Sequence, residues 1–88
     1  MFTVTWSEDA SRDLGRVWDA FPHLHPHLRM ARDVVDHHLR NDPIGQSEGR
    51  EIDTRRILFA YPLGILFDVN VDEKKILVLT AWAYELPT

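Results

Sequence analysis

The chain has 88 residues, a length that supports one small domain. Its net charge of −4 argues against non-specific binding to nucleic acid. The absence of cysteine excludes disulfides and thiolate metal sites, and it fits a reducing compartment. No signal peptide and no apolar stretch of the roughly 18 residues needed to cross a membrane is visible. We therefore expect a single cytoplasmic domain over residues 1–88 that does not contact membranes.

The N-terminal half predicts one strand followed by two helices. Aromatic and aliphatic residues alternate with threonine over residues 2–6, which predicts a strand with one buried face. Apolar residues at helical spacing predict a helix over about 8–20, with Ser7 as its N-cap and Pro22 as its stop. A second helix is predicted over about 27–40. Because their connection is short, the two helices are expected to pack as an antiparallel hairpin.

The C-terminal half predicts a polar loop and then a three-strand meander. Residues 44–53 are polar, contain two glycines and form the longest predicted loop, where functional residues tend to lie. The strands are predicted at about 55–61, 63–71 and 75–84. The last of them is apolar on both faces, which predicts a central position in the sheet. The expected class is α+β, with Trp18, Leu28, Val35, Phe67, Val69 and Val78 mainly buried.

Six segments carry a family resemblance through their order and spacing. They are Val4-Thr5-Trp6-Ser7-Glu8-Asp9-Ala10 with Asp13-Leu14, His38-Leu39-Arg40-Asn41-Asp42-Pro43, Ser47-Glu48-Gly49-Arg50, Arg56-Ile57-Leu58, Pro62-Leu63-Gly64-Ile65-Leu66-Phe67-Asp68-Val69 and Val78-Leu79-Thr80-Ala81-Trp82. In this order, and over nearly the whole chain, they resemble the RelE/ParE superfamily of bacterial toxins from type II toxin–antitoxin systems, the plasmid stabilisation family. The resemblance implies a β-α-α-β-β-β order, with the helical hairpin on one face of a twisted, largely antiparallel sheet.

The resemblance also implies a partner and a choice of activities. The partner is an antitoxin, a small protein whose flexible segment wraps the toxin. RelE-like members cleave messenger RNA on the ribosome, ParE-like members poison DNA gyrase, and some relatives have no demonstrated toxicity. The chain is therefore expected to be a toxin acting on one of these two targets, or alternatively a non-catalytic protein-binding module with the same fold.

Cleavage of messenger RNA requires groups that activate a ribose 2′-hydroxyl, stabilise the phosphate transition state and protonate the leaving oxygen. The residues here that can supply such groups are Glu48, Arg50, Arg55, Arg56 and Tyr84. Arginine forks bind phosphate well. The same arginines can instead form exposed ion pairs or contact an acidic stretch of the antitoxin. The acids available in sequence for such ion pairs are Glu48, Glu51 and Asp53.

Two departures from the cleaving members weaken the enzymatic interpretation. One catalytic arginine of the family corresponds to a position near Gly64 in this chain. The strand predicted at 63–71 has no basic residue. The stretch after Trp82 has neither arginine nor histidine, although Tyr84 can take the role of the family's terminal tyrosine. The sparse basic residues favour binding over catalysis.

Five histidines raise the question of a zinc site, since neutral imidazole is a common zinc ligand. His23, His25 and His27 alternate, which places ligands on one face only in a strand, and the neighbouring prolines make this segment a helix connection. His37 and His38 follow on the second helix. We expect no metal and no cofactor. The three tryptophans are expected in the core, with base stacking by Trp82 or Tyr84 as the alternative.

Overall fold

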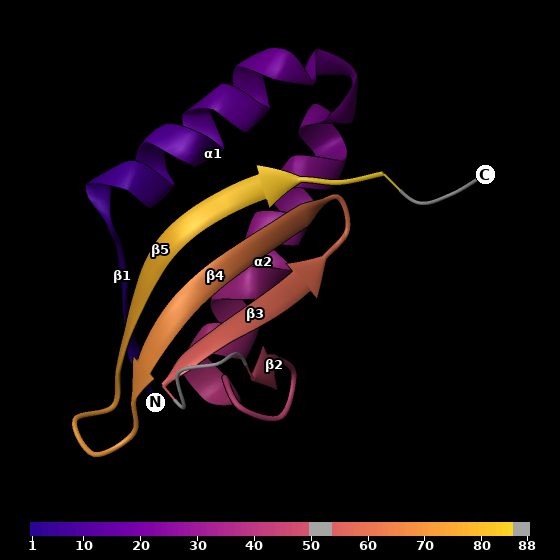
Figure 1. The fold of residues 1–88 in the computed structure, drawn as a ribbon. Coiled ribbons are helices and arrows are strands. Elements are labelled where there is room, and N and C mark those ends of the chain that lie inside the picture. Colours follow the sequence, from indigo (N-terminus) through magenta and orange to yellow (C-terminus); the bar gives the residue numbers. More distant parts are fainter. Residues whose placement is uncertain (50–53, 86–88) are drawn as a thin grey trace.

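One five-stranded sheet forms the framework of the computed structural model, which describes residues 1–49 and 54–85 (Figure 1). The strand order across the sheet is β1-β5-β4-β3-β2. β1 pairs with β5 in parallel, and every other described pair is antiparallel. The elements are β1 (Thr3–Trp6), α1 (Glu8–Ala20), the 3-10 turn η1 (Pro22–Leu24), α2 (His25–Asn41), β2 (Glu48–Gly49), β3 (Arg55–Ala60), β4 (Leu63–Asn70) and β5 (Lys75–Ala83). The predicted α+β class, the element order and the central place of the last strand are confirmed.

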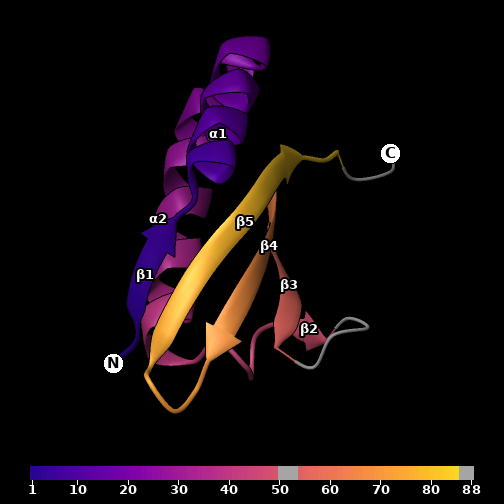
Figure 2. The same ribbon diagram turned by 60° about the vertical axis from the view of Figure 1, so that its left-hand side comes forward.

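Both helices lie on the same face of the sheet, and they form the predicted antiparallel hairpin (Figure 2). α1 begins where the sequence predicts, because the Ser7 hydroxyl oxygen accepts a 3.0 Å hydrogen bond from the Ala10 N–H. Glu8 and Asp9 place negative charge in its first turn. The Ser7 hydroxyl also donates to the Leu79 carbonyl at 3.2 Å, which joins the start of the helix to β5.

The core fills the space between the helices and the sheet. Its buried members from the helices and strands are Ala10, Ala31, Val35, Leu39, Leu58, Leu63, Ile65, Phe67, Val69, Ile76, Val78 and Ala81. Of the six residues predicted to be buried, Leu28, Val35, Phe67, Val69 and Val78 are buried.

The prediction for Trp18 is wrong, because its side chain is only half-buried. Trp18 lies in the last turn of α1, where the hairpin projects beyond the end of the sheet (Figure 2). Its ring stacks on His25, with centroids 3.5 Å apart and planes 5° apart. The Arg29 guanidinium lies 5.3 Å from the ring centroid. Two residues of α2, His25 and Arg29, therefore cover this ring.

The segment predicted as an uninterrupted loop contains the short strand β2. Glu48 pairs with Ile57 and Gly49 with Arg56. Two residues are too few to give a periodic pattern, so only the partner strand β3 reveals them as a strand. α2 also begins two residues before its predicted start, at His25, with a proline in its first turn.

Trp82 does not join the core as predicted. Its neighbour Ala81 is buried in the core, and alternation along β5 places Trp82 on the opposite face of the sheet. There it packs across the ladder on Gly64, which is its pairing partner in β4. Among the described residues, both α1 and α2 lie on the other face, so this one is called the open face below (Figure 2).

Candidate functional site

The candidate residues divide between two ends of the sheet. Arg55 and Arg56 begin β3, and Glu48 lies beside them in β2. Tyr84 follows β5 at the other end, where its N–H donates to the Pro62 carbonyl at 2.9 Å. At the usual rise of a strand, the length of β3 separates these ends by about 17 Å. The structure does not bring Tyr84 together with the arginines, and Arg50 lies outside the described residues.

Arg55 points to the open face and pairs with an aspartate that was not considered from sequence. Its Nε donates to Asp68 Oδ1 at 3.1 Å, and the two residues face each other directly across β3 and β4. The side chains remain 37% and 34% exposed, so the pair stabilises the fold by less than about 1 kcal/mol. Only the antiparallel register reveals this contact. The aspartate reduces the positive charge that Arg55 can offer to a phosphate.

Arg56 points to the other side of β3, because successive side chains in a strand alternate. Its Nε donates to the Ser47 hydroxyl at 2.6 Å, and its Nη2 donates to the carbonyls of Ser47 and Ile44 at 2.9 and 3.3 Å. Ser47 in turn donates to the Pro43 carbonyl. Three of the guanidinium's hydrogen bonds therefore hold the segment between α2 and β2. Arg55 and Arg56 cannot approach one phosphate from the same face.

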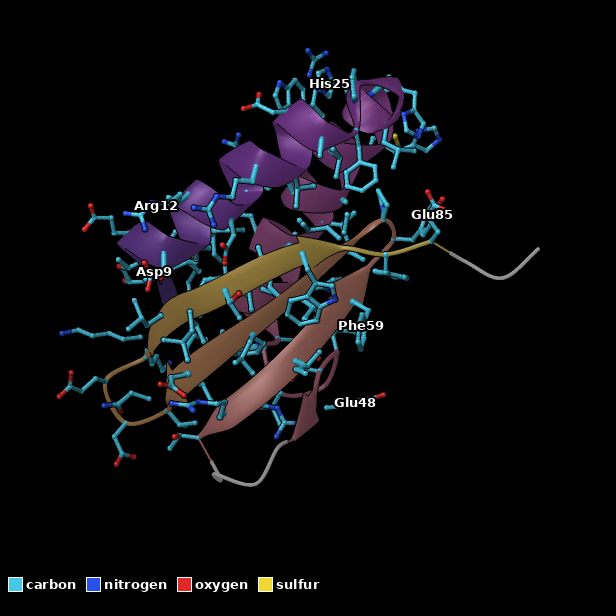
Figure 3. The ribbon with its side chains drawn as sticks, turned by 45° about the horizontal axis from the view of Figure 1, so that its top comes forward. Asp9, Arg12, His25, Glu48, Phe59 and Glu85 are labelled. Atoms are coloured by element: carbon cyan, nitrogen blue, oxygen red, sulfur yellow. The ribbon has the colours of Figure 1, made fainter. Side chains whose placement is uncertain are left out.

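Tyr84 belongs to a group of four aromatic side chains at one end of the open face. The group, called the aromatic cluster, consists of Phe59, Tyr61, Trp82 and Tyr84. Its rings meet edge to face, with centroids 5.4 to 6.1 Å apart. Phe59 and Tyr61 are 46% and 43% exposed. Figure 3 shows Phe59 on the sheet, separated from Glu48 at the β2 edge. Large half-exposed rings of this kind are suited to contact with another molecule.

The phenol of Tyr84 is not suited to act as a base. Burial raises its pKa above the ordinary value of 10.0, and the neighbouring Tyr61 raises it further. At neutral pH the group is therefore a protonated phenol, which can donate a hydrogen bond.

The place near Gly64, where the family resemblance implies an arginine in cleaving members, is covered in this chain. A Cβ built on Gly64 would lie 2.6 Å from Cε2 of Trp82, closer than real contacts allow. No longer side chain fits there while the indole keeps its position. The open face presents an aromatic ring at this point of β4.

The structure also shows a polar junction that was not assigned a role from sequence. Oδ2 of Asp13 accepts a 2.8 Å hydrogen bond from the Thr80 hydroxyl and a 3.3 Å hydrogen bond from the Ala81 N–H. These two hydrogen bonds lower the pKa of Asp13 below its usual 3.8. β1 ends at its pairing with Val78, so Asp13 satisfies a backbone donor on the edge that β1 leaves uncovered.

The histidines are placed as neighbours of other side chains. Nε2 of His25 donates to the Trp18 carbonyl at 2.7 Å, since a carbonyl can only accept. His37 and His38 meet edge to face. Within residues 1–49 and 54–85, no group of three or more histidine, aspartate or glutamate side chains is arranged to hold a metal ion. In the same part of the chain, no helix is both long and apolar enough to span a membrane.

Comparisons with known proteins identify the architecture. No family model and no curated protein sequence matches the chain significantly. Among solved structures, it resembles the toxin–antitoxin complex RelBE2 from Mycobacterium tuberculosis, with a TM-score of 0.73 and 15% identity over 93% of this chain and 96% of that one.

Two further solved structures are similar in fold to this chain. The chromosomal ParDE TA system from P. aeruginosa gives a TM-score of 0.61 and 25% identity over 97% of this chain and 98% of that chain. The isolated E. coli RelE toxin gives a TM-score of 0.72 and 9% identity over 99% of this chain and 88% of that one. The alignments extend over nearly the whole length of all the chains, so the similarity is not confined to one motif. The chain therefore has the fold of the RelE/ParE superfamily, as its sequence resemblance predicts.

Proposed function

We propose that this protein is the toxin component, or a toxin-like module, of a type II toxin–antitoxin pair, and that it acts by binding a protein. The observation that carries this proposal is the match in fold, over more than nine-tenths of this chain, to chains from the RelBE2 complex and the ParDE system. An antitoxin is accordingly the expected partner. DNA gyrase, the target of ParE-like toxins, is the first target to test.

The geometry of the candidate residues supports binding over cleavage. Arg55 is paired with Asp68, and Arg56 is bonded to the segment after α2 on the other side of β3. Tyr84 lies at the opposite end of the sheet with a raised pKa. Phosphate cleavage needs charge stabilisation and proton transfer at one point, and these groups do not meet at one point.

The aromatic cluster is the surface that we propose for contact with the target. Exposed aromatic side chains are enriched where protein interfaces derive most of their binding energy. Edge-to-face packing also restricts the rings before binding, so little conformational entropy is lost on contact. No arginine or lysine contributes to the cluster, which favours a protein over a nucleic acid as the ligand.

The test is induced expression in a bacterial host, followed by gyrase supercoiling assays with the purified protein. Wild type is expected to arrest growth and to inhibit supercoiling. The double variant Phe59→Ala/Tyr61→Ala, which removes two exposed rings, should abolish both the growth arrest and the inhibition of supercoiling. The matched control is Val71→Ala, which removes an exposed apolar side chain, 57% exposed, outside the cluster. Growth arrest with normal supercoiling would eliminate gyrase as the target.

Cleavage of ribosome-bound messenger RNA is the second candidate, favoured by one observation. Arg55 lies on the open face and keeps a third of its side chain accessible. Toeprinting of ribosome-bound messages in induced cells tests it directly. A protein that neither arrests growth nor cleaves messages would instead be a binding module without toxicity.

A further inference from the structure

The aromatic cluster owes its arrangement to a glycine in the strand between its rings. Phe59 in β3 and Trp82 in β5 are the two pairing partners of Gly64, so they lie opposite each other across β4. Because the glycine has no side chain, the two rings meet edge to face over it, with centroids 6.1 Å apart. A Cβ at this position would collide with the indole. The sheet therefore fixes rings from two strands relative to each other before any ligand binds.

Two rings of the cluster are open to solvent. Phe59 and Tyr61 are 46% and 43% exposed, whereas Trp82 and Tyr84 are half-buried. Phe59 meets Trp82 and Tyr84 at interplanar angles of 80° and 82°. The face of an aromatic ring carries partial negative charge, so an exposed ring face attracts a cation.

The strands that carry the cluster hold no positive side chain that competes for these rings. Residues 57–70 and 76–85 contain no lysine, arginine or histidine, and their acidic residues are Asp68 and Glu85. Asp68 already belongs to the ion pair at the other end of the sheet. Glu85 follows Tyr84 directly, is exposed and forms no ion pair with the described residues (Figure 3). The electrostatic surroundings of the cluster therefore favour a cation.

We propose that the aromatic cluster binds an arginine side chain of the target protein, with the guanidinium stacked on Phe59 and Tyr61 and with Glu85 as its counter-charge. The proposal rests on the proposed function for the identity of the partner, which is then the target of the toxin. A guanidinium is planar and weakly hydrated, so it stacks on aromatic rings while its N–H groups remain available to a carboxylate. The ammonium group of lysine is more strongly hydrated and fits such a surface less well.

Four short capped peptides test the proposal without the target protein. They share one polar sequence and differ at a central residue, which is arginine, lysine, citrulline or glutamate. Citrulline has the shape of arginine but no charge, so it separates stacking of a cation from simple contact. Affinities are measured by NMR titration at low salt, where screening is weak. The amide signals of residues 59–64 and 82–85 report contact with the cluster.

Wild type is expected to bind the arginine peptide roughly fivefold more tightly than the citrulline peptide, with the lysine peptide between them. Phe59→Leu/Tyr61→Leu keeps two apolar side chains but removes the ring faces, and it should remove this preference. Glu85→Gln should reduce the preference. Asp72→Asn is the matched control, because it removes one negative charge at the turn between β4 and β5, at the opposite end of the sheet. This control should bind as wild type does, and circular dichroism confirms that each variant is folded.

Equal affinity of wild type for the arginine and citrulline peptides would overturn the proposal, as would no detectable binding of the arginine peptide. Equal losses in Asp72→Asn and Glu85→Gln would overturn it too, because the attraction would then come from the net charge of the chain. Signal changes confined to the Arg55 end of the sheet would place the cation elsewhere and also contradict it. Inhibition of gyrase is measured separately. Its absence contradicts gyrase as the target and leaves the peptide result intact.

Discussion

The indole of Trp82 lies directly over Gly64 across β4 and β5, 2.6 Å from where a Cβ on that glycine would be. The pair fills the open face at a position where cleaving relatives are expected to carry an arginine. The same contact connects Trp82 to the aromatic cluster through Phe59, 6.1 Å away between ring centroids. It therefore links the stability of the sheet to the surface proposed for binding.

Gly64→Ala should destabilise the protein by about 1–3 kcal/mol, because the added methyl group overlaps the indole that packs on the buried Gly64. The backbone at this position does not need a positive φ, so the loss reports the lack of space. Urea denaturation measures it. Gly15→Ala is the control and should raise stability by roughly 0.5–1 kcal/mol. In a double-mutant cycle with Trp82→Ala most of the penalty should disappear, and a penalty that persists would place its origin elsewhere.

Arg56→Ala should lower the free energy of unfolding by about 1–3 kcal/mol, because Ser47 and Ile44 lose charged hydrogen-bond donors. Arg56→Lys should recover only part of the loss, since an ammonium cannot reproduce three directed hydrogen bonds. Thermal unfolding measures stability, and amide exchange in residues 44–49 measures loop opening. A variant of unchanged stability that has lost biological activity would instead indicate a direct role for Arg56 in binding a target.

Cleavage of ribosome-bound messenger RNA by this protein is expected to be weak or absent. If it occurs, Arg50→Ala, Arg55→Ala or Arg56→Ala should reduce it by roughly a hundredfold, the usual contribution of one charge-stabilising donor. Toeprinting on ribosomes compares the three variants with wild type. Asp68→Ala is the informative companion, because it frees Arg55 from its ion pair and should leave cleavage unchanged or increased. Vigorous cleavage that survives all three arginine substitutions would mean that other residues carry the chemistry.

The contribution of Asp13 to stability should depend on pH. Its pKa in the folded protein is lowered by hydrogen bonds from Thr80 and Ala81, so its carboxylate stabilises the fold above the unfolded-state value. That contribution is lost as the pH falls from about 4 through the folded-state pKa. Urea midpoints of wild type and Asp13→Asn, measured from pH 7 to pH 3, should differ most at neutral pH and converge in acid. A constant difference across this range would exclude the ionised carboxylate as the cause.

Co-expression with a small acidic protein from the neighbouring reading frame should yield a co-purifying complex. Binding to the native state alone stabilises it by roughly 2.7 kcal/mol when the free partner is at a hundred times its Kd. The melting temperature should therefore rise with partner concentration. Finding neither a complex nor a shift in melting temperature would contradict the toxin assignment.

Local sequence patterns were sufficient to predict the main helices and strands and most of the core. The threonine alternation before Trp6, the Ser7 cap and the apolar spacing of α2 each act within a few residues, so they can be identified without knowledge of the fold. For the same reason, the order of elements and the superfamily resemblance could be predicted. Trp18 was misplaced because burial depends on which element lies opposite, and the end of the hairpin extends past the sheet.

The arrangement of the candidate site was decided by pairing between distant segments. Arg55 and Arg56 are adjacent in sequence, yet strand alternation sends them to opposite faces. Their partners Asp68 and Ser47 follow from the register of β3 with β4 and from the path of the chain after α2. Register is set by how a whole face packs, so no short stretch of sequence contains it. The sequence determined which side chains are available, and the tertiary structure decided which of them can act together.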